Sequence, residues 1–187
     1  MINMNTDMKF SLPTSNKGFT LVELLVVIAV LGVLAAGVLV AINPLEQLAR
    51  GSDTGRKSSI TELGRATVAY YTAQGQYFAT SNSWITTNLK STGEVKITPN
   101  NTYPTGIGCN TAANRENNYC YATATVAGNI EAIVYARLES GSDRARAGCT
   151  TAQGVYFVYS TLLGQAGYIC TTNATTDPSA SLTSLVN

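Results

Sequence analysis

The feature that most constrains this chain is an uncharged apolar run from Leu24 to Ile42. Its length is close to the roughly 20 residues that an α-helix needs to cross a hydrocarbon core about 30 Å thick. One carboxylate, Glu23, stands directly before the run. Inserting an ionisable group with such a segment into a membrane costs roughly 2.5–3.5 kcal/mol, so a residue of this kind is a candidate for a functional role. The sequence therefore predicts a membrane helix whose first carboxylate has a role of its own.

Two plainer interpretations compete with this one. A cleaved secretory signal has an apolar region of about 7–15 residues that ends at small residues. The present run is longer and has Glu23 near its start, although Ala35-Ala36-Gly37 does offer small residues. A plain membrane anchor explains the length of the run and leaves Glu23 without a role.

The flanking charges indicate an orientation. Lys9 and Lys17 precede the run, so the positive-inside bias predicts a single pass with the N-terminus in the cytoplasm. Arg50, Arg56 and Lys57 follow the run and weaken this argument.

Composition argues against catalysis. The 187 residues contain no histidine, the commonest general acid–base residue and metal ligand. No G-x-S-x-G, P-loop or H-E-x-x-H pattern occurs. We therefore expect no enzyme, no cofactor and no metal site, although Asp143 and Asp177 lie in predicted loops to which a calcium ion could bind.

Four cysteines, at positions 109, 120, 149 and 170, form no C-x-x-C pair. In an exported domain an even count predicts two disulfides. Of the three possible pairings, Cys109–Cys120 with Cys149–Cys170 closes the shortest loops. The connectivity stays open at this point, and four buried free thiols are the alternative.

A resemblance to a known family rests on the residues before the apolar run. They resemble the processing site of bacterial type IV prepilins and pseudopilins, a likeness that covers about 50 residues: Lys17-Gly18-Phe19-Thr20-Leu21-Val22-Glu23. It implies that a membrane peptidase removes a leader of residues 1–18 by cutting between Gly18 and Phe19, and methylates Phe19. It also implies that Glu23 pairs with the N-terminal amine of a neighbouring subunit, which costs less than burying either charge alone. A hydrated Glu23 at the headgroup level is the alternative.

The resemblance also implies a function and partners. We expect a structural subunit of a type IV pilus-like filament, held in the inner membrane and then polymerised into a surface filament. The implied partners are the prepilin peptidase and methyltransferase, copies of the chain itself, an inner-membrane assembly platform and, before assembly, the lipid bilayer. A type II secretion pseudopilin and a membrane-anchored extracytoplasmic binding module are the alternatives. Nucleic acid is a partner only if the filament takes up DNA, and Arg144-Ala145-Arg146 is the compact basic feature available for it.

The expected fold is α+β, with a transmembrane and assembly helix over 19–43 and an amphipathic helix over 44–75. Pro44 lacks an N–H and predicts a kink, and the resemblance implies that the segment from Gly32 to Pro44 opens on assembly. Gly51 to Gly55 is the weakest part, and a continuous helix of about 54 residues would be ~80 Å long. Apolar residues at steps of three and four predict one buried face: Leu45, Leu48, Ala49, Ile60, Leu63, Ala66 and Tyr70.

Residues 76–118 are rich in Ser, Thr, Asn and Gly and predict a connecting loop with little regular structure. Residues 119–187 predict a small antiparallel sheet with a disulfide-closed C-terminal loop. Alternation of apolar residues predicts four strands, at 119–126, 130–138, 155–159 and 168–170. The helix face from Ile60 to Tyr70 is expected to cover one face of this sheet. The polar tail from Thr171 is expected to be mobile.

Overall fold

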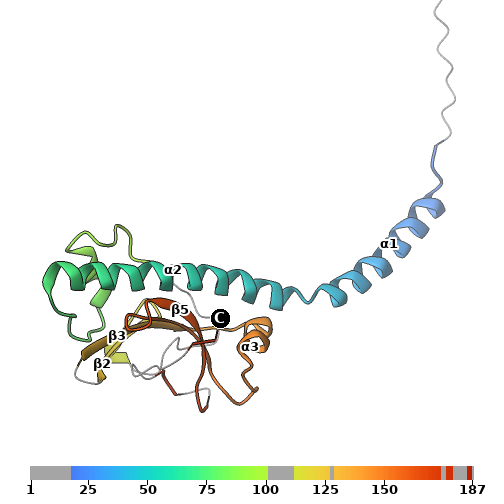
Figure 1. Ribbon diagram of the computed structural model, residues 1–187. Coiled ribbons are helices and arrows are strands. Elements are labelled where there is room, and N and C mark those ends of the chain that lie inside the picture. Colours follow the sequence, from blue (N-terminus) through green and yellow to red (C-terminus); the bar gives the residue numbers. More distant parts are fainter. Residues whose placement is uncertain (1–17, 101–111, 127–128, 174–175, 179–184, 187) are drawn as a thin grey trace, which may run out of the picture. The chain divides into compact units, whose positions relative to one another are not determined.

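The computed structural model describes residues 18–100, 112–126, 129–173, 176–178 and 185–186. The chain divides into two compact units at the bond between Asn43 and Pro44 (Figure 1). We call them the amino-terminal unit and the carboxy-terminal unit and describe each by itself.

The amino-terminal unit is a single helix, α1 (Leu21–Ile42). Thr20 caps its start, and Asn43 ends it in the left-handed conformation with φ 47°. No side chain of α1 is buried, and by length and composition the helix is able to cross a membrane. A helix that is apolar on every side needs an apolar environment outside its own chain.

The carboxy-terminal unit begins with α2 (Pro44–Gln74). Proline suits the first position of a helix, where its missing N–H has no partner to lose. A continuous helix of about 54 residues does not form, because the left-handed Asn43 separates α1 from α2 directly before Pro44, the residue at which a kink was predicted. The doubtful segment from Gly51 to Gly55 is helical throughout. Gly75, with φ 72°, follows the last residue of α2 as predicted.

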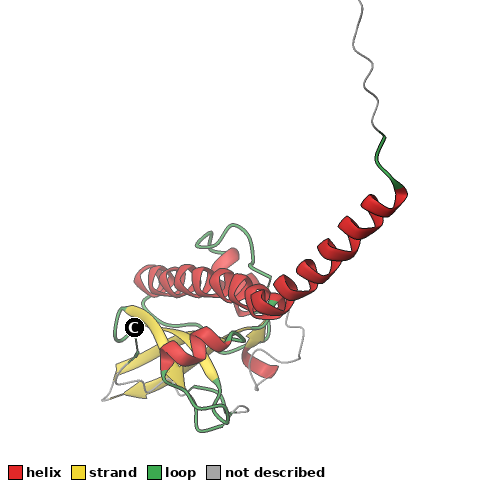
Figure 2. Cartoon of the chain, turned by 90° about the vertical axis from the view of Figure 1, so that its right-hand side faces the viewer, coloured by secondary structure: helices red, strands yellow, loops and turns green. Residues whose placement is uncertain are grey.

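Five antiparallel strands form one sheet in the order β1-β2-β3-β4-β5. Figure 2 shows the strands of this sheet in yellow. The four predicted strands are confirmed, and the additional strand is the two-residue β1. The bounds are β1 (Arg115–Glu116), β2 (Tyr119–Val126), β3 (Asn129–Arg137), β4 (Val155–Ser160) and β5 (Gln165–Cys170). The expected α+β architecture is thus confirmed, and the sheet has one strand more than the four predicted.

Helix α2 packs on one face of the sheet, as expected, through Ile60, Leu63 and Ala66. Alternate residues of β3 meet this helix face: Ala132, Val134 and Ala136. The predicted apolar stripe is wrong at its beginning, because Leu45 and Leu48 are 77% and 69% exposed. The sheet begins to cover α2 only beyond these first two turns.

The second face of the sheet is also buried. Ile133 and Tyr135 point to the side opposite α2 and pack with Cys120, Tyr156 and Val158. Leu185 packs against the same cluster. Where the C-terminal segment is described it is therefore a structural part of the sheet, contrary to the prediction of a mobile tail.

Two contacts hold this segment in place. Val186 forms a bridge with Tyr168 of β5, in which the backbone N–H groups donate over 2.9 and 2.7 Å. Asp177 contacts the hydroxyls of Tyr135 and Tyr156. Burial, followed by the charge of Asp177, raises the pKa of Tyr156 to about 12.

The predicted loop 76–118 contains regular structure, so that expectation is partly wrong. It holds a π-helical turn, η1 (Ile85–Lys90), and a short 3₁₀ turn, η2 (Ala112–Asn114). Trp84, Ile85 and Leu89 are fully buried in the core beneath α2. Residues 101–111 lie outside the described residues.

One helix was not predicted. Helix α3 (Gly141–Ala147) follows β3, and Ser140 caps it by accepting a hydrogen bond from the N–H of Asp143. Asp143 therefore lies in a helix rather than in the calcium-binding loop that the sequence left open. The pattern Ser-x-x-Asp is a capping signature that would have revealed this start.

Candidate functional site

The predicted cleavage site lies in the chain just before α1. Gly18, Phe19 and Thr20 are not helical, and Phe19 is 86% exposed. No atom outside its neighbours comes within 4 Å of a side chain placed at Gly18. The Gly18–Phe19 bond is therefore open to a protease in the structure of this chain, while residues 1–17 of the predicted leader lie outside the described residues.

Glu23 is held at the very start of α1. The backbone N–H and the hydroxyl of Thr20 donate to Glu23 Oε2 over 2.9 and 2.8 Å. The N–H of Glu23 donates in return to Thr20 Oγ1 over 3.2 Å. This reciprocal capping box satisfies N–H groups that the helix leaves without partners. It also fixes the carboxylate one residue away from Phe19, where a cut after Gly18 would create an amine.

Gly32 and Pro44 bound the segment in which the helix was predicted to kink or unwind, and they lie in two different helices. Gly32 lies inside the regular helix α1, and Pro44 is the first residue of α2. The break in the helical path is at Asn43. Opening of the segment between Gly32 and Pro44 on assembly stays a prediction.

One of the two predicted disulfides, between Cys149 and Cys170, is present. It joins the turn after α3 to the end of β5 and closes the loop that contains β4. Cys120 is also disulfide-bonded. Its predicted partner, Cys109, lies outside the described residues.

Sequence reasoning missed a group of buried charges between α2 and the segment before α3. Asp53 and Arg56 are 0% and 1% exposed, and Arg56 Nη1 donates to Asp53 Oδ1 over 2.6 Å. Arg56 Nη2 lies 3.4 Å from Glu139 Oε1. Asp53 Oδ2 also accepts the backbone N–H groups of Glu139 and Ser140 over 2.9 and 2.7 Å. Removing one member would leave a buried charge without its partner, which is strongly destabilising.

The polar contacts between α2 and α3 continue on both sides of that group. Glu46 accepts the backbone N–H groups of Gly141 and Ser142, each over 3.0 Å. These two bonds, and then Arg50, lower the pKa of the Glu46 carboxyl. Four side chains of α2, spaced along its first half, therefore hold the start of α3: Glu46, Asp53, Arg56 and Lys57.

Lys57 forms the last of these links. Its Nζ donates to Asp143 Oδ1 over 2.8 Å, and the hydroxyl of Tyr168 donates to the same oxygen over 2.9 Å. Burial alone would raise the pKa of Asp143, but the bonds from Lys57, Tyr168 and Ser140 outweigh it and lower that pKa. Burial likewise opposes the charge on Lys57, and the bond to Asp143 raises its pKa nonetheless.

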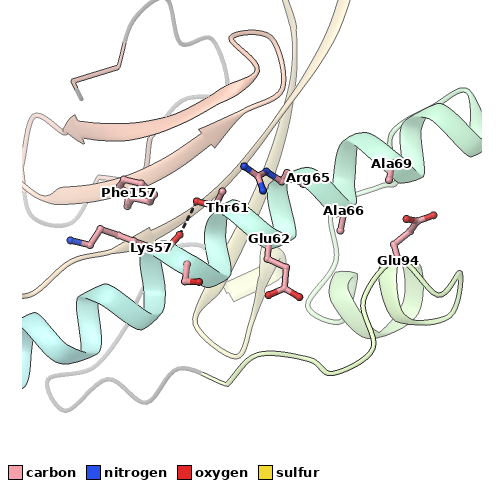
Figure 3. A pocket seen from close by; sticks show the side chains of 9 residues that line it. Lys57, Thr61, Glu62, Arg65, Ala66, Ala69, Glu94 and Phe157 are labelled. Atoms are coloured by element: carbon pink, nitrogen blue, oxygen red, sulfur yellow. Dashed lines mark hydrogen bonds between the residues drawn. The ribbon is translucent and has the colours of Figure 1, made fainter.

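A groove of about 700 Å³ lies on α2 (Figure 3). Side chains of both signs line it, with Lys57 and Phe157 at one end and Glu94 at the other. Its other lining residues are Ser58, Thr61, Glu62, Arg65, Ala66 and Ala69. Within the described ranges no group of three His, Cys, Asp or Glu side chains is placed to hold a metal ion.

Arg144 and Arg146, the basic pair considered for nucleic acid, differ in their contacts. Arg144 Nη1 donates to the backbone oxygens of Thr150 and Gln153 over 2.9 and 2.6 Å, so this side chain orders the turn after α3. Arg146 lies in the last turn of α3 and is exposed. The pair therefore does not form one basic surface.

Comparison with known proteins gives one positive result. Residues 13–39 match the model of the prokaryotic N-terminal methylation motif. No curated protein and no solved structure matches the chain. The matched residues include the exposed Gly18–Phe19 bond, the capped Glu23 and most of α1. The chain thus carries the hallmark of prepilin-type precursors, from which the subunits of type IV pili and pseudopili are made.

Proposed function

We propose that this protein is the structural subunit of a type IV pilus-like filament. It is stored in the inner membrane with its N-terminus in the cytoplasm, cut after Gly18, methylated at Phe19 and polymerised through α1. One observation carries the proposal: the methylation motif coincides with an exposed, non-helical Gly18–Phe19 bond at the start of a wholly apolar helix. The prepilin peptidase, the assembly platform and other copies of the chain are the partners that this route requires.

The assembly step depends on a charge pair that exists only after processing. Cleavage gives Phe19 a charged amine, and Glu23 follows it by four residues, in the first turn of α1. A carboxylate and an ammonium group that meet in an apolar filament core stabilise each other, whereas each alone is costly to bury. The capping box with Thr20 keeps the Glu23 carboxylate at the helix end until a neighbouring subunit supplies the amine.

Electron microscopy of Glu23→Ala tests this proposal. The variant should be processed and membrane-bound but should form no filaments, because the N-terminal amine of a neighbouring subunit has no carboxylate to pair with. Glu62→Ala, which removes an exposed carboxylate of α2, is the matched control and should form filaments at the wild-type level.

Three other outcomes would change the assignment. Wild-type amounts of filament from Glu23→Ala would refute the charge pair. Processed protein without surface filaments, in cells that lose protein export when the gene is deleted, would assign the chain to a secretion pseudopilus. An uncut chain in the membrane would indicate an anchored binding module.

A further inference from the structure

A small pocket between α2 and α3 presents two arginines to the solvent. Its volume is about 240 Å³, and its lining residues are Arg50, Thr54, Lys57, Ser142, Asp143 and Arg146. Lys57 is neutralised by Asp143 within the fold. Arg50 binds Glu46 through Nε alone, and its side chain is 50% exposed. Arg146 makes no ion pair with any described residue. Most guanidinium N–H groups of the two arginines therefore remain available, and the planar guanidinium group is well suited to bind phosphate oxygens.

Chain connectivity limits the distance between the backbone of Arg50 and the end of the candidate membrane span. Arg50 follows Ile42, the last residue of that span, by eight residues. Six of these steps lie in α2 and rise about 9 Å, and the two steps before them add at most about 8 Å. The Cα of Arg50 thus lies within about 17 Å of the end of the span at any angle between the two helices.

The first two turns of α2 have the character of an interfacial segment. Leu45 and Leu48 are the large apolar side chains that these turns expose, and neither packs on the sheet. They follow the end of the span by three and six residues. Segments at a membrane interface bury such side chains at the acyl boundary and keep basic residues at the lipid phosphates.

We propose that Arg50 and Arg146 bind the headgroup phosphate of an anionic phospholipid, and that this contact seats the carboxy-terminal unit on the bilayer before assembly. This inference rests on the membrane-stored stage of the proposed function. Phosphatidylglycerol fits the pocket by its single negative charge, whereas phosphatidylcholine carries a positive group that the arginines repel. The bound lipid would hold α2 at the membrane until the subunit is extracted into a filament.

Native mass spectrometry of the full-length protein tests the site. The detergent-solubilised protein is mixed with equal amounts of phosphatidylglycerol and phosphatidylcholine, and bound lipids are counted for each. The wild type should retain phosphatidylglycerol preferentially, and Arg146→Ala should weaken that binding about fivefold, the effect of one basic side chain near an anionic surface. Arg65→Ala, an exposed arginine of α2 outside the pocket, should bind as the wild type does.

Several results would overturn the site. Equal retention of the two lipids, or an equal loss in Arg146→Ala and Arg65→Ala, would refute it. Displacement of the lipid by millimolar inorganic phosphate would assign the pocket to free phosphate, and concentration-dependent dimers that lose lipid would assign it to a second copy. An intact Cys149–Cys170 disulfide in Arg146→Ala verifies folding. Failure of the chain to insert into vesicles would refute the membrane-stored stage itself, whereas insertion without lipid preference would refute this inference alone.

Discussion

Glu23 and Thr20 occupy the end of α1 at which processing would create a new amine. The capping box formed by these two residues organises the helix start in the uncut chain. The same carboxylate is the group that we propose to pair with a neighbouring subunit after the cut. In the proposed route this one side chain has two partners in succession, Thr20 before the cut and the amine of a neighbouring subunit after it.

Gly64 is the glycine of α2 that the sheet requires. A Cβ at this position would lie 2.2 Å from Cγ of Tyr159, a contact that real side chains do not make. Gly64→Ala should lower the free energy of unfolding by about 1–3 kcal/mol, the usual effect of overpacking a core. Urea unfolding of the full-length protein in detergent, followed by fluorescence of the buried and single Trp84, measures this change.

Gly55→Ala is the matched control. Nothing lies within 4 Å of a Cβ at Gly55, so alanine should stabilise α2 by about 0.5–1 kcal/mol. Equal effects of the two substitutions would contradict the close approach of α2 to β4.

Asp143 makes the stability of the carboxy-terminal unit depend on pH in the acidic range. Its pKa is lower in the folded chain, so its contribution to stability is complete above the ordinary value of about 4 and is lost as the pH falls further. Asp143→Asn should be less stable than the wild type at pH 7, and the difference should shrink below about pH 4. Thermal unfolding from pH 3 to pH 7 measures it, with the exposed Glu62→Gln as control. A difference that is constant over this range would contradict the pairing with Lys57.

At the scale of elements, the regular patterns were predictable and the extent to which each element is buried was not. The alternation at Tyr119–Val126 identified β2 with its correct bounds. Cys120, Ala122 and Ala124 pack on one face of the sheet, and Tyr119 and Tyr121 pack on the other. The stripe through Ile60, Leu63 and Ala66 identified the covered face of α2. The same reasoning failed at Leu45, since periodicity shows which residues share a face but not how far the sheet extends along it.

The burial of the charged side chains could not be predicted from the sequence, for a related reason. Asp53 and Arg56 are ordinary surface residues by type, and their burial depends on backbone N–H groups that lie 86 and 87 residues further along the chain. No local pattern contains that information. The N-terminal methylation motif was predictable because it lies in consecutive residues of the chain, among them Gly18 to Glu23.

The disulfide between Cys149 and Cys170 fastens α3, β4 and β5 together. The two cysteines are 21 residues apart, and closing a loop of this size stabilises a fold by about 3 kcal/mol. The double variant Cys149→Ser and Cys170→Ser should lose about that much stability in urea unfolding. This variant leaves the disulfide of Cys120 in place, which simple reduction would not. Unfolding at the wild-type urea concentration would show that the fold does not depend on this closure.

At the scale of the whole molecule, the proposed cut changes the charge as well as the N-terminus. Residues 1–18 hold two of the 12 basic and one of the 11 acidic residues, so the processed chain would have ten of each. A neutral subunit packs against its copies with little Coulomb repulsion. Arg50, Arg56 and Lys57, which weakened the predicted orientation, are paired with Glu46, Asp53 and Asp143 in the folded unit.

Intact-mass analysis of the protein from the membranes of its own cells tests the central claim most directly. The account predicts a chain that begins at Phe19 and carries one added methyl group on that residue. Cells without the prepilin peptidase should contain only the uncut chain. A different N-terminus, an unmethylated Phe19, or the same mass with and without the peptidase would contradict the proposed processing and, with it, the assembly that depends on the new amine.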